Sequence, residues 1–466
     1  MVGTIGPSSV SYDVIKSMII SGVDVIRINM AYASFDFAKE VILSVRKIDL
    51  ELGKTTGIMI DTVGPELKIG GLEKPEVYLE KGRTIRLVDS EIIGNSEIVS
   101  VNKEIITHTK INDEIYLNNA SVKLKVITKD EDNLLCEIKN NGVIISESTI
   151  NVPNVDFNIK FLNERDISIV KFALEMKVDY LALSKVKEEL DILDVNDLLI
   201  SLNDSNITIL SKIENAHAYE QIDKILNVSD GIIISRGDLA IDMGIEKVPS
   251  VQKELTMKAK TTEKIVVIAT EMFTSMKDNE KPTRAEVSDV ANAVIDSVDA
   301  LMLGAETAIG SYPIETVKIM NSVIEEIEKT INYNELLKNI IENEEDNISK
   351  AIAYSSVDVG NKVHAKAIVC STLSGKTAKD ISFYRPSSPV IAISPNSDVV
   401  RGLSINYGII PLTVGMAKTT DELIELSIEA SKKALDLKMN DKVVIVGSFP
   451  LESINYTNFM KIEEIK

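Results

Sequence analysis

The stretch LSKIENAH (210–217) places a lysine and a glutamate two residues apart at the end of an apolar run. Side chains two residues apart in a β-strand project to the same side. We therefore expect Lys212 and Glu214 to lie side by side at the tip of a strand. Two kinds of chemistry are open to such a pair. It is either an exposed ion pair that contributes little to stability, or an ammonium group beside a carboxylate in an active site.

A second carboxylate follows another apolar run, in GIIISRGD (231–238). Asp238 could complete a magnesium site with Glu214, because Mg²⁺ usually takes one or two protein carboxylates and otherwise binds water and substrate oxygens. The alternative is a plain turn, since glycine followed by aspartate is common in turns. The three histidines and two cysteines are far apart in the sequence and indicate neither a zinc site nor a histidine-based triad.

Eight short apolar runs, most of them followed by helical periodicity, must position these side chains. They occupy residues 2–6, 24–29, 57–62, 179–186, 207–214, 231–238, 264–270 and 300–307. This pattern predicts an α/β fold with a (β/α)8 TIM barrel, in which chemistry takes place at the C-terminal ends of the strands. Polar residues stand at those ends: Arg27 and Asn29, Asp61 and Thr62, Ser184 and Lys185, Lys212 and Glu214, Arg236 and Asp238, Thr270, and Glu306.

The chain of 466 residues is too long for one core, and two further units are visible. From about residue 72 to 150 apolar and polar residues alternate without a clear helix, which predicts an all-β module. It leaves just after the third barrel strand, so we expect a mobile lid over the catalytic face. After an Asn- and Glu-rich linking region (333–347), a second α/β unit follows. The predicted domains are the barrel (1–70 and 153–335), the inserted lid (71–152) and the C-terminal α/β domain (345–466).

The composition excludes several classes of protein. A net charge of −20 argues against a general nucleic-acid or membrane-surface binder, because both need basic surfaces. Two distant cysteines, Cys136 and Cys370, fit a reducing cytoplasm better than secretion. The N-terminal MVGTIGPSS has no basic start, and no run of about 18 apolar residues occurs, so we expect neither a signal peptide nor a transmembrane helix.

Seven segments carry a resemblance to a known family. SKIEN, SDGIIISRGDL, ATEMFTSM, PTRAEVSDVANAV and ETAIGSYP follow one another between residues 207 and 317, and TIGPSS and IDTVGPELKIG lie near the N-terminus. In this order and spacing, the chain resembles the pyruvate kinases over nearly its whole length. The resemblance implies the same barrel, lid and C-terminal domain. It also implies glycolytic phosphoryl transfer from phosphoenolpyruvate to ADP, giving pyruvate and ATP, by a homotetramer that uses Mg²⁺ (or Mn²⁺) and K⁺.

The resemblance implies roles for the residues at the strand ends. Lys212 would stabilise the transferring phosphoryl group and the enolate oxygen, and Arg27 would grip the substrate phosphate. Glu214 and Asp238 would bind Mg²⁺. The Thr270 hydroxyl would lie by the substrate carboxylate, near the carbon that gains a proton, within an ATEM motif in which Glu271 stands where glutamine is usual. Gly237 would let backbone N–H groups approach the substrate carboxylate.

A potassium site is implied next to these residues. Its ligands would be Asn29, Asp61 and Thr62, whose oxygen atoms suit a hard cation, and Glu66 matches the glutamate that accompanies potassium dependence. A buried Arg27–Asp61 ion pair without a further role is the alternative reading of the same residues.

The departures from the family gather in the half of the site that would bind nucleotide and potassium. The changed positions are Ala31 for serine, Tyr32 for histidine, Val63 for lysine, Lys68 for arginine, Glu147 and Ser148 where a basic residue is usual, Asn118 and Asn119 for aspartates, and Ala305 for glycine. Tyr32 and Lys68 are the predicted nucleotide contacts, although lysine is a poor substitute for an arginine that binds phosphate in a bidentate manner. Lys185 or Lys187 could supply compensating charge.

A second anion site is predicted in the C-terminal domain. STLSGKT (371–377) resembles a phosphate-binding loop for a sugar-phosphate effector, with Cys370 in place of a first glycine. The predicted contacts are Ser371, Thr372, Ser374, Gly375, Lys376 and Thr377. The alternative is an ordinary helix start capped by serine and threonine. The companion segment GSFPLESINYTN (447–458) is poor in glycine where the family is rich.

Three functions remain open from the sequence. The first is a pyruvate kinase. The second is a paralogue with weak or lost kinase activity that acts as a regulatory or binding protein. The third is an enzyme that retains only metal-assisted enolate chemistry on an oxo acid. The metal-binding half favours an enzyme, and the altered nucleotide half argues against a fast kinase.

Overall fold

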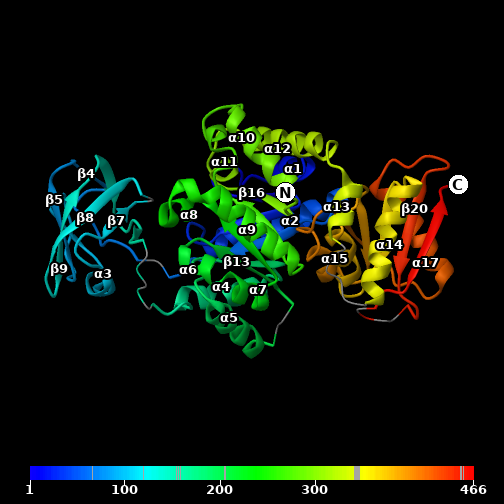
Figure 1. Ribbon diagram of the computed structural model, residues 1–466, viewed down its shortest axis with the longest axis horizontal. Helices are drawn as coiled ribbons and strands as arrows, with labels where there is room; N and C mark the ends of the chain where they lie inside the picture. The colour runs from blue at the N-terminus through cyan, green and yellow to red at the C-terminus, as the bar shows by residue number, and fades with distance from the viewer. Residues whose placement is uncertain are drawn as a thin grey trace.

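The computed structural model describes residues 1–65, 67–118, 120–153, 155, 157, 159–203, 206–340, 347–451, 454 and 456–466. Three parts follow one another along its long axis in Figure 1. The inserted β-strands (cyan) lie at one end, the barrel and its helices lie in the middle, and the C-terminal α/β unit (yellow to red) lies at the other end.

Eight parallel strands close into a barrel, which confirms the predicted fold. The strands are β1 (Val2–Thr4), β2 (Val25–Asn29), β3 (Gly57–Asp61), β12 (Tyr180–Leu183), β13 (Thr208–Ile213), β14 (Gly231–Ser235), β15 (Ile265–Ala269) and β16 (Ala300–Leu303). Around the barrel they run in the order β1, β16, β15, β14, β13, β12, β3, β2. Nearly all their residues are buried, because one face fills the barrel and the other packs against helices.

Helices surround the barrel and pack apolar stripes against it. They are α1 (Tyr12–Ile20), α2 (Phe35–Leu52), α4 (Glu164–Glu175), α5 (Glu189–Ser201), α6 (Ala216–Glu220), α7 (Ile222–Val228), α8 (Arg236–Met243), α9 (Val248–Thr261), α10 (Arg284–Ile295), α11 (Ala305–Ala308) and α12 (Pro313–Glu328), with 3₁₀ turns at Ile245–Lys247 and Thr274–Lys277. In α2, for example, Val41, Ile42, Val45 and Ile48 recur at helical spacing and are buried. Such helices hold the strands, and therefore the strand ends, in place.

The insert contains two small sheets built from alternating strands. The strands are β4 (Glu76–Leu79), β5 (Thr84–Val88), β6 (Ile98–Ser100), β7 (Glu114–Leu117), β8 (Val122–Lys129), β9 (Asn133–Ile138), β10 (Gly142–Ile145) and β11 (Ile150–Asn151). Six form one sheet in the order β11-β7-β8-β9-β5-β6, and β10 pairs with β4. One short helix, α3 (Lys103–His108), departs from the all-β prediction; it forms because Ile105 and Ile106 enter the apolar core of the insert.

The C-terminal unit is a five-stranded sheet covered by helices. Its elements are α14 (Ile348–Val363), β17 (Ala367–Ser371), α15 (Lys376–Phe383), β18 (Val390–Ser394), α16 (Ser397–Arg401), β19 (Ile409–Thr413), α17 (Thr420–Ala434), β20 (Lys442–Gly447) and β21 (Phe459–Glu464). The sheet order is β19-β18-β17-β20-β21, with β21 antiparallel to β20 at the edge.

Part of the predicted linking region is helical. Residues Tyr333–Ile340 form α13, whose Leu337 is buried in the C-terminal core, while 341–346 lie outside the described residues. We propose to retain the predicted domain boundaries, and the hydrophobic clusters support separate cores for the insert and the C-terminal unit. No helix in the described part of the chain is both long and apolar enough to cross a membrane.

The C-terminal unit is attached to the barrel at the end opposite the predicted catalytic face. Ile405 packs with barrel residues such as Val25 and Tyr180. The Tyr180 hydroxyl donates to the Arg401 carbonyl at 3.0 Å and accepts from the Ile405 N–H at 3.1 Å. The Arg401 side chain also pairs with Asp179 at 2.9 Å. This packing closes the floor of the barrel and leaves its other mouth to the insert.

Candidate active site

Lys212 and Glu214 lie side by side at the tip of β13. The Lys212 Nζ is 2.9 Å from the Glu214 Oε1, and their side chains are only 12% and 3% exposed. Lys212 also lies 3.3 Å from the Asp61 carboxylate and donates to the Ser184 hydroxyl at 3.0 Å. An exposed surface pair is therefore excluded. Burial disfavours the charged amine, but the Asp61 and Glu214 carboxylates outweigh burial and raise the pKa of Lys212, so its charge is retained.

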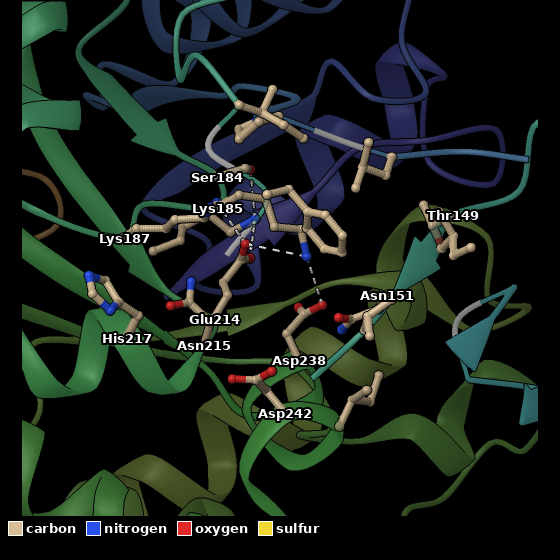
Figure 2. A pocket seen from close by; sticks show the side chains of 18 of the residues that line it. Thr149, Asn151, Ser184, Lys185, Lys187, Glu214, Asn215, His217, Asp238 and Asp242 are labelled. Carbon is tan, nitrogen blue, oxygen red and sulfur yellow. Dashed lines mark hydrogen bonds and ion pairs between the residues drawn. The ribbon is translucent and has the colours of Figure 1, made fainter. Parts of the chain in front are cut away.

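Glu214 and Asp238 converge on one point inside the cavity. The Lys185 Nζ occupies that point in Figure 2, 3.7 Å from the Glu214 Oε2 and 3.2 Å from the Asp238 Oδ1. Burial acts to raise the pKa of Glu214, but the ammonium groups of Lys212 and Lys185 outweigh it and lower the pKa to about 2. The pKa of Asp238 is raised, first by burial and then by the neighbouring Glu214 carboxylate.

These two carboxylates fit a divalent metal ion that draws its other ligands from substrate and water. The Lys185 ammonium already lies within 3.7 Å of both carboxylates. The arrangement of Glu214 and Asp238 therefore accommodates a positive charge between them. Among the described residues no group of three or more histidine, cysteine, aspartate or glutamate side chains could hold a metal. Two carboxylates are nevertheless the usual protein contribution to Mg²⁺ beside a phosphate substrate.

Arg27 and Asp61 form a buried ion pair between β2 and β3. The Arg27 Nε is 2.9 Å from the Asp61 Oδ2, and an Arg27 terminal nitrogen also contacts that oxygen. A second terminal nitrogen donates to the Thr4 hydroxyl at 3.0 Å. The same carboxylate accepts from the Ser184 hydroxyl and from Lys212. The pair considered as an alternative in the sequence is thus present, and it joins Arg27 to Lys212 through one shared carboxylate.

The other two predicted potassium ligands lie at the same strand ends. The Asn29 side-chain oxygen accepts from the Ala31 N–H at 3.0 Å and so shapes the turn after β2. The Thr62 hydroxyl accepts from the Ser184 N–H at 3.0 Å, and the Thr62 carbonyl, 2.7 Å from the Ser184 hydroxyl, shares the single proton of that hydroxyl with Asp61. Glu66 lies outside the described residues.

Thr270 has an unusual backbone that turns its hydroxyl toward Gly237. Its φ of 66° lies in the left-handed region, which a β-branched residue rarely adopts. The Thr270 hydroxyl accepts from the Gly237 N–H at 2.8 Å and donates to the Ala269 carbonyl at 2.7 Å. The buried Arg236 stabilises this turn by donating to the carbonyls of Thr270 and Glu271 at 2.8 and 3.0 Å. Strain maintained in this way is typical of functional sites.

Two further residues act on the backbone around the site. The buried Glu306, at the end of the eighth strand, accepts from the N–H groups of Phe273 and Gly304, so its role is structural. Asp166, which the sequence reasoning missed, accepts from the Val63 and Gly64 N–H groups at 2.9 and 3.0 Å. It thus holds the segment that leads from β3 into the insert. The only local hint of this role in the sequence is that Asp166 stands three residues after the helix cap Asn163, in the first turn of α4.

A cavity of about 510 Å³ lies between the barrel mouth and the insert. Polar side chains from the barrel, including Lys185, Lys187, His217, Asp238 and Asp242, line one side of it (Figure 2). The insert and the segment that follows it contribute a largely apolar part of the lining: Tyr116, Ile150, Val152, Val155, Phe157 and Ile159. The volume is that of a typical small-molecule site.

The predicted nucleotide contacts are placed differently from one another. Tyr32 lines the cavity and is 85% exposed, and Ala31 and Val63 also line it. Lys68 is half-buried on the strand that leads into the insert, where its backbone pairs with Thr149; the described cavity lining does not include it.

The changed lid positions provide no positive charge. Glu147 is exposed in a left-handed turn, Ser148 is buried, and the Asn118 amide donates to the Val143 carbonyl. Asn119 lies outside the described residues.

The predicted effector loop forms a strand-to-helix turn between β17 and α15. The Thr372 hydroxyl accepts from the Gly375 N–H at 2.9 Å, and Gly375 has the left-handed φ of 87° that favours glycine. The Lys376 ammonium pairs with both Asp380 oxygens at 2.9 and 3.1 Å. The Thr377 hydroxyl bonds to the Thr457 hydroxyl at 2.7 Å, which brings the two predicted effector segments together. Ser371 ends β17, and the Ser374 hydroxyl faces the Lys376 N–H at 3.4 Å.

Comparisons with known proteins agree with the fold. The family models "Pyruvate kinase, barrel domain" and "Pyruvate kinase, alpha/beta domain" match residues 1–317 and 350–463. A pyruvate kinase of Staphylococcus haemolyticus is 36% identical over 465 residues, which cover 99% of this chain and 79% of that protein. A pyruvate kinase of Clostridium acetobutylicum is 34% identical over 468 residues, which cover 100% of this chain and 99% of that protein. The crystal structure of a pyruvate kinase from Cryptosporidium parvum matches with a TM-score of 0.92 and 31% identity, covering 99% of this chain and 95% of that chain. The chain therefore belongs to the pyruvate kinase family, as its motifs predict.

Proposed function

We propose that the protein is a pyruvate kinase that transfers the phosphoryl group of phosphoenolpyruvate to ADP, giving pyruvate and ATP. The observation that carries the proposal is the arrangement of the buried Lys212 and Glu214 with the partly exposed Asp238 at the barrel mouth, in a cavity of substrate size. Phosphoryl transfer requires little covalent chemistry from the protein and depends on positioned positive charge. A binding protein without catalysis would not need a lysine and carboxylates held together in a cleft in this way.

Lys212 and Arg27 supply the positive charge of the protein itself. In the reaction the bond between phosphorus and the enol oxygen breaks, a terminal ADP oxygen bonds to phosphorus, and negative charge develops on the enolate oxygen. Lys212 is held protonated by Asp61 and Glu214, so it can stabilise that oxygen and the transferring group. Arg27 is fixed by Asp61 and the Thr4 hydroxyl and is joined to Lys212 through the shared Asp61 carboxylate, and we assign it to the substrate phosphate.

Glu214 and Asp238 would hold Mg²⁺ or Mn²⁺. The bound metal supplies Lewis-acid stabilisation of phosphate, carboxylate and enolate oxygens. Glu214 is suited to this role because its lowered pKa keeps it ionised, and its second oxygen is oriented by the Lys185 N–H at 2.8 Å. The start of α8 at Arg236 and Gly237 lies beside Asp238, and we assign the substrate carboxylate to this helix start, where the Gly237 N–H already donates to the Thr270 hydroxyl.

The proton that completes pyruvate is delivered from the Thr270 side. The enolate carbon accepts this proton after the phosphoryl group has left. The Thr270 hydroxyl is oriented by the Gly237 N–H, the Ala269 carbonyl and its strained backbone, and we assign to it the transfer of a proton from solvent to that carbon.

The proposal extends to the nucleotide, potassium and effector sites of the family. ADP would enter the cavity on the side of Tyr32, with Lys68 nearby on the lid strand. K⁺ would use Asn29, Asp61 and Thr62, although Asp61 already accepts from three side chains. A sugar phosphate would use the loop at 371–377, in a cytoplasmic homotetramer; Cys136 and Cys370, both buried free thiols, fit a reducing compartment.

One assay tests the proposal. Phosphoenolpyruvate, ADP, Mg²⁺ and K⁺ are supplied, and pyruvate formation is followed for the wild type and for Lys212→Met. We expect turnover in the wild type and a loss of about 100–1,000-fold in the variant. Absence of wild-type turnover, together with no ADP binding by calorimetry, would contradict the proposal. Proton exchange at the methyl group of pyruvate without ADP-dependent turnover would indicate enolate chemistry alone.

A further inference from the structure

Lys185 enters the candidate metal site from the end of β12, the strand beside β13. Its backbone has a left-handed φ of 62°, and its N–H donates to the Glu214 Oε2 at 2.8 Å. The side-chain stem lies against Gly64, where an added Cβ would come within 3.1 Å of the Lys185 Cγ. The unusual backbone, the anchored N–H and the close stem contact together direct the side chain toward the two carboxylates (Figure 2).

The ammonium of Lys185 joins the two carboxylates that the metal would use. It lies 3.2 Å from the Asp238 Oδ1 and 3.7 Å from the Glu214 Oε2. Lys212 divides its contacts between Glu214 and Asp61. In the described part of the chain, Lys185 is therefore the cation that contacts both Glu214 and Asp238.

A divalent ion cannot bind the same oxygens while this ammonium stays in place. Two cations within about 4 Å of each other repel strongly at the reduced dielectric of a partly buried site. The Lys185 side chain is about one-third exposed, at 35%, and borders the cavity, so it has space into which it can withdraw. Lys212, at 12% exposed and held from two sides, has no such freedom.

We propose that Lys185 is a tethered competitor of the divalent metal at Glu214 and Asp238. It neutralises the carboxylate pair before the metal binds, and metal binding releases its ammonium into the cavity. There the released charge faces the side proposed for the acceptor phosphates, where Val63 brings no positive charge. The inference rests on the proposed function only in taking Glu214 and Asp238 as the metal ligands, and it makes Lys185 a positioning residue that sets metal affinity.

A Mn²⁺ titration without substrate or nucleotide tests this inference. The electron paramagnetic resonance signal of free Mn²⁺ measures binding to the wild type, Lys185→Met and Lys187→Met. Lys187 lines the same cavity, so its variant controls for loss of one positive charge nearby. We expect Lys185→Met to bind Mn²⁺ about tenfold more tightly than the wild type or better, and Lys187→Met to differ by less than about threefold. Damage to the fold would weaken binding and cannot produce this gain.

Two more variants make the result specific. Lys185→Arg keeps the charge and is expected to retain the low wild-type affinity, and Glu214→Gln is expected to abolish the tight binding when added to Lys185→Met. Equal or weaker binding by Lys185→Met, or no binding by either protein, would overturn the inference. The titration contains no phosphoenolpyruvate, so a gain in affinity without kinase turnover would refute the proposed function alone, and turnover without a gain would refute the competition alone.

Discussion

Replacing Thr270 separates the strain in its backbone from the chemistry of its hydroxyl. The φ of 66° costs an L-residue about 1–2 kcal/mol, and glycine adopts it without that cost. Thr270→Ala keeps the strain and removes the hydroxyl, which leaves the Gly237 N–H without its acceptor and costs about 1–2 kcal/mol of stability. Thr270→Gly loses the same hydrogen bonds but releases the strain.

The difference between the two variants measures the strain. Releasing the strain makes Thr270→Gly about 1–2 kcal/mol more stable than Thr270→Ala. About 0.4–1 kcal/mol of this gain is lost, because glycine raises the entropy of the unfolded chain. Thr270→Gly should therefore be about 1 kcal/mol more stable than Thr270→Ala, which corresponds to about 2 °C in the melting temperature of a domain of this size. Thermal unfolding of the two variants side by side is the assay.

In catalysis, by contrast, the two variants should behave alike, because both lack the hydroxyl. Both should lose about 100-fold or more in proton delivery to the enolate, followed as deuterium uptake at the methyl group of pyruvate in D₂O. A glycine variant no more stable than the alanine variant would refute the strain, and wild-type deuterium uptake by either variant would refute the role of the hydroxyl.

Three further predictions concern the backbone around the site and the barrel floor. Gly237→Ala should change stability by less than about 1 kcal/mol, because the added Cβ would meet Thr270 atoms at an ordinary 3.5 Å. The same variant should raise KM for phosphoenolpyruvate about tenfold, and an unchanged KM would count against substrate contact at Gly237. Asp166→Ala should lower stability by at least about 2 kcal/mol, since two buried N–H groups lose their acceptor. Glu164→Ala, on the same helix turn, is the control. Equal melting temperatures of the two variants would refute the role of Asp166 as acceptor for these N–H groups. Burial, with repulsion from Arg385, lowers the pKa of Lys260 to about 8 from 10.5. The folded chain therefore binds fewer protons than the unfolded chain between these pH values. Wild-type stability, measured by denaturant unfolding, should rise across that window relative to Lys260→Met, from a deficit of about 3 kcal/mol at pH 7 to none above about pH 10.5.

The barrel and the polar residues at its strand ends could be predicted from the sequence because both rest on local patterns. Apolar runs of strand length and polar residues at their ends are visible without knowledge of distant contacts. The two-residue spacing of Lys212 and Glu214 determines which side they share, and their nitrogen and oxygen lie 2.9 Å apart in the structure. The family motifs suggested the roles of these residues, and the matches over both domains agree with the family itself.

The features that the sequence did not reveal depend on closure of the barrel or on packing. Lys185 reaches Asp238 across 53 residues of chain, and no local pattern records that contact. The left-handed turn at Thr270 lacks the glycine or asparagine that usually marks one. Helix α13 was missed because its Asn- and Glu-rich composition resembles a linker, although Leu337 supplies an apolar contact to the C-terminal core.

Phosphorus NMR of the complete reaction tests the central claim most directly. Phosphoenolpyruvate and ADP are mixed with the protein, Mg²⁺ and K⁺, and the phosphorus resonances are followed for the wild type and Lys212→Met. Transfer through the Lys212, Glu214 and Asp238 site predicts that the phosphoenolpyruvate signal is replaced by that of the ATP γ-phosphate, and that the variant slows this about 100-fold or more. Release of inorganic phosphate in place of ATP, or equal rates in the two proteins, would contradict the account.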